Sequence, residues 1–177
     1  MEIWEAIQRR YSVRKFQERM VDRKILLALA EAAQKAPSAS NLQARRFLFI
    51  TDCALRGKVE LFSPGISGKP PVILVICSDM DKASQKGGKN AEKYGCMMDA
   101  AMAAENIMLL ALEYGLGCCA IKSYNDVAIR KILQIPSGYR IELLVSIGYP
   151  EGNGHSPQRP PVNTVTFFDR WEEKGND

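Results

Sequence analysis

Histidine is nearly absent from this sequence, since His155 is the only one among 177 residues. It stands in the stretch EGNGHSPQRPP, whose glycines and prolines predict a loop, so we expect a solvated loop histidine. A Ser-His or Cys-His nucleophile, or a multi-histidine metal site, would depend on this single residue. We therefore expect neither a metal site nor a catalytic side chain. If the protein is an enzyme, a bound cofactor would carry the difficult chemistry.

Paired cysteine motifs are also missing. The five cysteines are Cys53, Cys77, Cys96, Cys118 and Cys119. None of them forms a CxxC pair, and the adjacent Cys118 and Cys119 suit neither a disulfide framework nor a zinc site. We expect all five to be buried, small apolar residues of a protein in a reduced compartment.

The sequence has neither a strong charge bias nor a targeting segment. Its net charge is +4, from 24 lysines and arginines against 20 acidic residues. This balance permits an anionic ligand but is far below the bias of a dedicated nucleic-acid binder. The N-terminus MEIWEAIQRR carries acids where a signal peptide has cations followed by an apolar run. These features predict a cytoplasmic protein that does not bind nucleic acid.

An uninterrupted membrane-spanning run is absent as well. The longest apolar stretch is GCMMDAAMAAENIMLLALEYGLG (95–117), which is interrupted by Asp99, Glu105 and Asn106. A membrane span needs about 20 consecutive apolar residues. Apolar side chains almost all round this helix, many of them alanine, predict a central helix that packs closely on several sides. We expect no membrane association.

The chain length fits one domain, because domains usually contain about 100–200 residues. Helical spacing of apolar residues predicts helices over 2–10, 22–35, 54–62, 95–117 and 126–133, and short apolar runs predict strands over 47–51, 72–77, 118–122 and 141–149. Asp22 is expected to cap the second of these helices. The polar segment 78–90 is expected to be mobile, and the proline-containing tail from residue 150 is expected to be an extended arm. Helices interleaved with strands predict a mixed sandwich of sheet and helices.

The stretch RRYSVRKF (9–16) is the first candidate for a binding site. Composition alone favours a solvated basic turn after a helix. However, Ser12 and the neighbouring backbone amides place neutral donors beside Arg10 and Arg14. Guanidinium groups with such donors suit a phosphate, which arginine can bind through two hydrogen bonds. Arg9 and Lys15 are expected to be surface charges.

Three further stretches carry polar or basic groups. In KAPSASNLQARRF (35–47), Ser38, Ser40, Asn41 and Gln43 suit the polar edge of a ring system or a ribityl chain, although a polar turn would explain them too. GLGCCAIKSYND (115–126) has a glycine-rich helix end but lacks GxGxxG and GxxxxGK[ST], so it supports neither a Rossmann site nor a P-loop. PQRPP (157–161) fixes one arginine between prolines, as a second candidate phosphate ligand.

Together these stretches resemble the FMN-dependent nitroreductase family. RRYSVRKF resembles the family's N-terminal R-x-S-x-[RK] signature, and APSASNLQ resembles its A-P-S-x-x-N-x-Q signature. DAAMAAENIMLLALEYGLG resembles the central helix, IGYP the last core strand, and QR in PQRPP the late basic motif. The resemblance covers residues 2 to about 160, and the motifs occur in the family's order.

The resemblance implies a fold and an assembly. The expected fold is α+β, nitroreductase-like, with a central, mostly antiparallel sheet flanked by helices in a single domain over residues 1–177. The family forms an intertwined homodimer, so the extended C-terminal arm (about 150–177) is expected to belong to that assembly. FMN would lie at each of the two subunit interfaces.

The resemblance also implies site residues. Arg10 and Arg159 would lie nearest the FMN phosphate. Arg14 would lie toward the ribityl chain and the N1/C2-carbonyl edge, where a cation stabilises the negative charge of the reduced flavin. Backbone groups from Ala120 to Ser123 would approach N5 and O4, and the segment from Pro37 to Asn41 would come from the partner subunit. The expected cofactor-binding residues are Arg10, Tyr11, Ser12, Arg14, Pro37, Ser38, Ala39, Ser40, Asn41, Gln43, Ala120, Ile121, Lys122, Ser123 and Arg159.

The implied function is FMN-dependent reduction of nitroaromatics, quinones or similar small molecules by NADH or NADPH. The implied mechanism is ping-pong, in which NAD(P)H delivers hydride to flavin N5 and the acceptor then takes its place. One alternative is a flavin carrier or sensor of the same fold without NAD(P)H turnover. The other is a small nucleic-acid or interaction module that uses the basic stretches.

Three departures from the family pattern bear on the site. The family usually continues N-x-Q-P-W, whereas here Gln43 is followed by Ala44, Arg45 and Arg46, whose charges could obstruct the flavin ring or attract an anionic substrate. The loop 62–71 lacks an asparagine that is common in the family. The late basic motif has Pro157 where a second cation is frequent. The chain also has few residues for a substrate lid.

Overall fold

The computed structural model describes residues 1–152, 154 and 157–171. His155, expected to be a loop residue, lies outside this part. The centre of the fold is a four-stranded sheet of β1 (Arg45–Ile50), β2 (Val72–Asp79), β3 (Gly117–Ile121) and β4 (Tyr139–Gly148) in the order β1-β2-β4-β3. All three pairings are antiparallel, which confirms the expected mostly antiparallel sheet.

The burial of each strand follows from its position in the sheet. β2 is the continuous apolar run VILVICSD; all of its residues except the last are buried, because helices cover both of its faces. β1 stands at one edge and alternates between buried and more exposed positions. In the register, Val75 of β2 pairs with Leu48 of β1 on one side and with Leu144 of β4 on the other. The two central strands, β2 and β4, are thus mostly buried and hold the sheet together.

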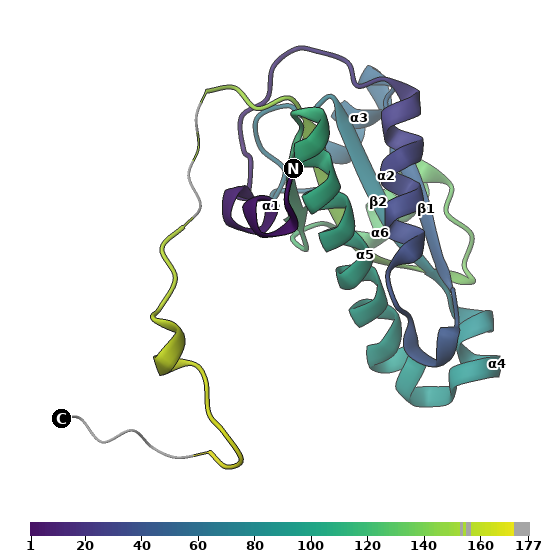
Figure 1. The fold of residues 1–177 in the computed structure, drawn as a ribbon. Helices are drawn as coiled ribbons and strands as arrows, with labels where there is room; N and C mark the ends of the chain where they lie inside the picture. Colours follow the sequence, from purple (N-terminus) through teal and green to yellow (C-terminus); the bar gives the residue numbers. More distant parts are fainter. Residues whose placement is uncertain (153, 155–156, 172–177) are drawn as a thin grey trace.

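Helices cover both faces of the sheet (Figure 1). On one face lie α2 (Arg23–Lys35), which Asp22 caps as expected by accepting from the Lys24 N–H, and α5 (Cys96–Ala111). They enclose a core that includes Leu29 and Ile107. On the other face, α3 (Cys53–Leu61) and α6 (Asp126–Leu133) pack over a second core around Ile129 and Val59. The short α1 (Ile3–Arg9) precedes the basic stretch and contacts α5.

The central helix has the predicted character. By length and composition alone, the helical run Met80–Tyr114 could cross a membrane. In this fold, however, the α5 part of the run packs against α2 and the sheet, and Ala100, Ala103 and Ile107 are fully buried. A core helix passes the same composition test, so the run is explained by packing within the domain. The helix gives way to a short 3₁₀ turn (η3, Leu112–Tyr114) before Gly115.

The expectation of a mobile segment over 78–90 is wrong. These residues form the last part of β2 and α4 (Met80–Asn90), which continues through the π-helical turn η2 (Ala91–Gly95) into α5. The helix begins because the Asp79 side chain accepts from the Lys82 N–H at 3.0 Å. Only Ala83 of α4 is buried, so its sequence has almost no apolar stripe from which a helix could be predicted.

The cysteines correct a second expectation. Cys77, Cys96, Cys118 and Cys119 are buried and free, as predicted, but Cys53 is exposed. Cys53 is the first residue of α3 and follows its capping residue Asp52, and the buried residue of this helix is Val59. All five cysteines lie in the described part of the chain, and none forms a disulfide.

The C-terminal segment leaves the body of the fold. Figure 1 shows residues 157–171 running away from the helices, with one short 3₁₀ turn, η4 (Val162–Thr164). Its apolar side chains are exposed, including Val162, Val165, Phe168 and Trp171. Its role as an arm on a second subunit stays a prediction.

Candidate functional site

The basic stretch after α1 runs along β3. Ser12 forms a parallel bridge with Cys118, whose carbonyl accepts from the Val13 N–H at 3.0 Å. Phe16 forms a second bridge with Pro150. Val13 and Phe16 are buried, so these two apolar residues anchor the stretch to the sheet while Arg14 between them remains exposed. In RRYSVRKF the buried apolar residues therefore anchor the stretch, whereas candidate ligand residues such as Arg14 remain exposed.

Arg10 and Arg159 line the same hollow, although they lie at opposite ends of the sequence. The hollow has a volume of about 490 Å³ and is also lined by Ile7, Gln8 and Glu105. Arg10 Nε lies 3.4 Å from Glu105 Oε1, in a pair that is partly exposed to solvent. Two guanidinium groups beside one carboxylate leave a net positive charge. This arrangement suits an anion with two negative charges, such as a phosphate monoester.

Tyr11 connects the basic stretch to the C-terminal segment. Its hydroxyl accepts a hydrogen bond from the Gly154 N–H at 3.2 Å. A Cβ on Gly154 would lie 2.1 Å from the Tyr11 ring, so the backbone can approach this ring closely only because position 154 is glycine. Tyr11 thus fixes the chain just before Arg159 reaches the hollow.

The β3–α6 connection, residues 122–125, is held from two sides. Lys122 Nζ donates to the Glu142 carbonyl at 2.6 Å and to the Tyr124 hydroxyl at 3.1 Å. The Ser123 carbonyl accepts from the Gly65 N–H at 3.2 Å. Burial raises the pKa of Tyr124, which therefore stays a neutral hydrogen-bonding group. Ala120, Ile121, Lys122 and Ser123 thus form a fixed strand end rather than a free loop.

The loop 62–69 contacts two of the segments predicted to bind FMN, the basic stretch and the end of β3. Gly65 packs against Ile121 and Ser123, and Gly68 packs against the backbone of Arg14 and Lys15. The loop lacks the asparagine common in the family but sets the spacing between the basic stretch and the end of β3. The sequence analysis noted only the missing asparagine of this loop, although its glycines are a visible signal of close backbone approach.

The second polar stretch forms a tight loop between α2 and β1. Gln43 N–H donates to Ser38 Oγ at 3.2 Å, and Gln43 Nε2 donates to Asn41 Oδ1 at 2.7 Å. Ala39 lies in a short 3₁₀ turn, η1 (Ala39–Asn41), and its N–H donates to Asp99 near the start of α5. The loop and Arg10 therefore contact α5 at different places, Asp99 and Glu105, about 9 Å apart along the helix at 1.5 Å per residue. Figure 1 shows the α2–β1 loop near α4, far from α1.

Arg45 and Arg46, the departures from the family pattern, point in different directions. Arg46 is partly exposed and pairs with Asp79 at 3.1 Å. Arg45 is 7% exposed, and its guanidinium donates to backbone carbonyls. Burial lowers the pKa of Arg45, while the nearby Asp99 carboxylate opposes this effect. Arg45, the first residue of β1, is thus buried beneath the loop and presents no charge at the protein surface.

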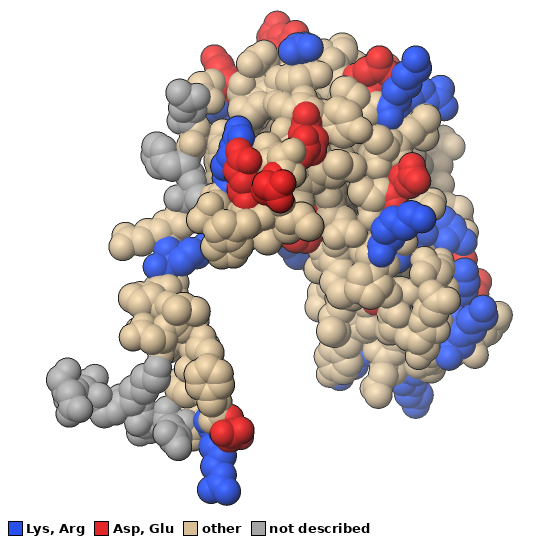
Figure 2. Space-filling view, viewed as in Figure 1, with Lys and Arg blue, Asp and Glu red and all other residues tan. Residues whose placement is uncertain are grey.

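Charged groups are unevenly placed on the surface. Figure 2 shows basic side chains toward the end of the molecule that carries α4. The lysines of α4 and η2 are Lys82, Lys86, Lys89 and Lys93. Lys82 Nζ donates to the Gln43 carbonyl at 3.2 Å, so this helix also touches the polar loop.

Among the described residues, no group of three or more His, Cys, Asp or Glu side chains could hold a metal ion.

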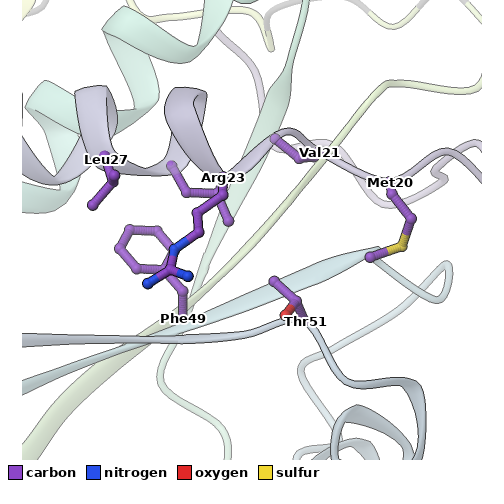
Figure 3. Close-up of a pocket in the computed structure, with 7 residues that line it drawn as sticks. Met20, Val21, Arg23, Leu27, Phe49 and Thr51 are labelled. Carbon is purple, nitrogen blue, oxygen red and sulfur yellow. The ribbon is translucent and has the colours of Figure 1, made fainter.

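A separate apolar hollow lies beside the free edge of β1. Figure 3 shows it between the start of α2 and the end of β1, with Leu27 and Phe49 on one side and Met20 and Thr51 on the other. Its volume is about 410 Å³. Met20 and Leu27 are more than half exposed, although both are large apolar residues. Nothing in the sequence motifs pointed to this hollow.

Comparisons with known proteins agree with these observations. Residues 7–67 and 60–149 match the family model described as Nitroreductase family. An "NADH dehydrogenase" of Thermus thermophilus is 27% identical over 192 residues, covering 92% of this chain and 94% of that protein. An "NADPH-dependent oxidoreductase" of Staphylococcus aureus is 29% identical over 192 residues, covering 96% and 74% respectively. A solved structure of an FMN-dependent nitroreductase from Clostridium difficile has a TM-score of 0.79 at 26% identity, covering 94% of this chain and 98% of that one.

Proposed function

The chain belongs to the nitroreductase family, and on that basis we propose that it is an FMN-dependent oxidoreductase that uses NADH or NADPH to reduce small molecules. The observation that carries this proposal is the position of Arg10 and Arg159 on one hollow, beside the anchored stretch Tyr11–Arg14. The relatives described as NADH- and NADPH-dependent support both electron donors. Nitroaromatics and quinones are the proposed acceptors, in a ping-pong reaction.

The residues present fit FMN. Arg10 and Arg159 would hold the phosphate, with Ser12 as a neutral donor next to them. Glu105 keeps Arg10 in place at 3.4 Å and reduces the local excess of positive charge. Arg14, which is exposed in the same basic stretch, would approach the ribityl chain and the N1 edge of the ring.

The end of β3 would hold the reactive part of the ring. When bound, FMN supplies the hydride-accepting and hydride-donating centre, and the protein supplies position and electrostatics. The segment Ala120–Ser123 is fixed by Lys122 and by the Gly65–Ser123 hydrogen bond, so its backbone groups are preorganised. A cation at Arg14 favours the negatively charged, reduced form of the ring. No side-chain acid or base is required.

We propose a homodimer in which Pro37–Gln43 of one subunit complete the site of the other. Within one chain this loop contacts α5 near Asp99 rather than the basic stretch, so a partner is needed to bring the two together. Large apolar residues on α1 and α5 are exposed, including Trp4 and Met98. The C-terminal segment, whose apolar side chains are also exposed, is expected to contact the second subunit.

A cytoplasmic location is consistent with the free cysteines in the described structure, because disulfides are rare in reducing compartments. We therefore expect the protein to function with all five thiols reduced.

The visible spectrum of the purified protein tests the proposed function. The expected result is a yellow protein, or one that becomes yellow when FMN is added, whose flavin absorbance near 450 nm is bleached by NADH or NADPH in stopped flow. Bleached protein should regain its colour when a quinone or nitroaromatic is added. Flavin bound without bleaching would identify a carrier or sensor, and a protein that never binds FMN would overturn the proposal.

A further inference from the structure

The α2–β1 loop has a strained backbone. Ser40, Asn41 and Gln43 have φ angles of 48°, 51° and 53°, in the left-handed region that side chains other than glycine rarely adopt. Each such residue costs free energy, so the conformation persists only where surrounding contacts hold it. Within the loop, side-chain hydrogen bonds join Gln43 to Ser38 and Asn41, and backbone hydrogen bonds close its short 3₁₀ turn. None of these bonds attaches the loop to the rest of the domain, so other residues must do so.

Arg45, at the start of β1, attaches the loop to the domain on the side of the strand. Its Nη1 donates to the Pro37 carbonyl at 2.9 Å, and its Nη2 donates to the Ala36 carbonyl at 2.8 Å. These carbonyls stand where α2 ends and the loop begins. Nη2 also lies 3.4 Å from Gln43 Oε1, at the other end of the loop. One guanidinium group thus joins the beginning and the end of the loop.

Asp99, in α5, attaches the loop to the domain on the side of the helix. Its carbonyl accepts from Arg45 Nη1 at 3.2 Å, and its Oδ1 accepts from the Ala39 N–H at 2.9 Å. Asp99 is 2% exposed; its Oδ1 is paired with the Ala39 N–H, whereas its buried Oδ2 has no hydrogen-bond partner among the described residues. The nearby Arg45 charge partly offsets the cost of burying this carboxylate. Both residues are buried, and they contact each other directly through the Asp99 carbonyl, so they hold the loop from the interior of the domain.

We propose that Arg45, together with Asp99, is the positioning residue for the flavin-binding loop Pro37–Gln43. This inference rests on the proposed function, because it assumes that the loop contacts FMN across a subunit interface. A loop already held in its bound conformation loses little entropy on binding, which increases affinity. The arginine that replaces the family's usual tryptophan therefore contributes to the flavin site without touching it.

The test compares Arg45→Met, which keeps the length and apolar body of the side chain, with Arg46→Met. Arg46 is a matched control, because it is the next arginine on the same strand but pairs with Asp79 at the surface. We expect Arg45→Met to raise the Kd for FMN by about tenfold or more through lost preorganisation. Arg46→Met is expected to stay within about twofold of the wild type, as surface substitutions usually do.

Hydrogen exchange of the flavin-free proteins gives a second readout. In Arg45→Met, the Ala39 and Gln43 amides should exchange faster while the amides of β2 and β4 keep their protection. Equal loss of protection everywhere would indicate a general loss of stability and would overturn a local role. Wild-type FMN affinity together with wild-type exchange of the loop would also overturn it.

A milder substitution covers the case in which Arg45→Met does not fold. Lysine keeps the charge but has one donor group instead of the planar fork, so Arg45→Lys should fold and bind FMN with intermediate affinity. Wild-type affinity and loop exchange in Arg45→Lys, with Arg45→Met unfolded, would count against the role. If the wild-type protein itself does not bind FMN, the proposed function fails, whereas the exchange data still report on Arg45 and the loop.

Discussion

Gly68 packs directly against the backbone of Arg14: a Cβ on Gly68 would lie 2.2 Å from the Arg14 carbonyl oxygen. Gly68 also has a φ angle of 73°, which favours glycine. The loop that precedes β2 can therefore approach the basic stretch only because this position has no side chain. The backbone of Arg14, and with it the direction of its guanidinium group, depends on a residue that carries no functional group.

Replacing Gly68 by alanine should displace Arg14. Gly115→Ala is the matched control, because Gly115 has a similar φ of 67° but no atom within 4 Å of the added Cβ. Both variants suffer the strain of the left-handed backbone, about 1–2 kcal/mol, but only Gly68→Ala also meets a backbone atom. Fluorescence titration with FMN should show at least about tenfold weaker binding for Gly68→Ala and near wild-type binding for Gly115→Ala. Equal affinities would contradict the role of the contact.

Replacing Arg14 by alanine should weaken FMN binding by about 1.5–3 kcal/mol, the range for a hydrogen bond to a charged group. Arg9 offers the control, since it is an exposed arginine that pairs with Glu5, one turn earlier in α1, at 2.8 Å. Arg9→Ala should bind FMN like the wild type. The same titration measures both variants, and an unchanged Kd for Arg14→Ala would remove Arg14 from the site.

Replacing Glu105 by glutamine should strengthen binding of the phosphate group. Glutamine keeps an acceptor for Arg10, which lies 3.4 Å away, but removes a negative charge from the hollow. For a partly exposed charge we expect about 0.2–1 kcal/mol, or up to about fivefold in the Kd for FMN. The gain should shrink in high salt because screening weakens surface electrostatics. Riboflavin, which has no phosphate, is the control ligand, and an equal gain for it would refute the electrostatic explanation.

Stability should fall in alkaline solution. Burial raises the pKa of Cys77 to about 11 and that of Cys118 to about 12, against an ordinary value of 9.0. Above pH 9 the unfolded chain therefore releases protons that the native chain retains, and the free energy of unfolding decreases as pH rises toward 11. The slope should approach about 1.4 kcal/mol per pH unit for each group. Urea unfolding at pH 8, 9 and 10 with reductant measures it.

Replacing Cys118 by alanine provides the comparison for the alkaline series. Its unfolding free energy should be lower at pH 8 because of lost packing, yet decline less steeply above pH 9. Parallel declines in the two proteins would show that the Cys118 thiol does not cause the effect.

Local features of the sequence were sufficient to predict the strands and most of the helices. The apolar run of β2, the helical spacing of α2 and the capping role of Asp22 were read correctly, because periodicity and caps depend on residues close together in the chain. α4 was missed for the same reason, since it has almost no apolar stripe and depends on its cap and on the polar loop. The family motifs supplied the candidate ligand residues.

The tertiary structure alone decided how those residues are supported. Arg45 and Arg46 are neighbours in a strand, so they point to opposite sides, but only the packing of α5 shows that Arg45 is the buried one. The pairing of Arg10 with Glu105 and the approach of Gly68 to Arg14 join residues that no local pattern connects. Such contacts arise when the layers pack together, so the sequence determined which groups are present and the fold determined which of them meet.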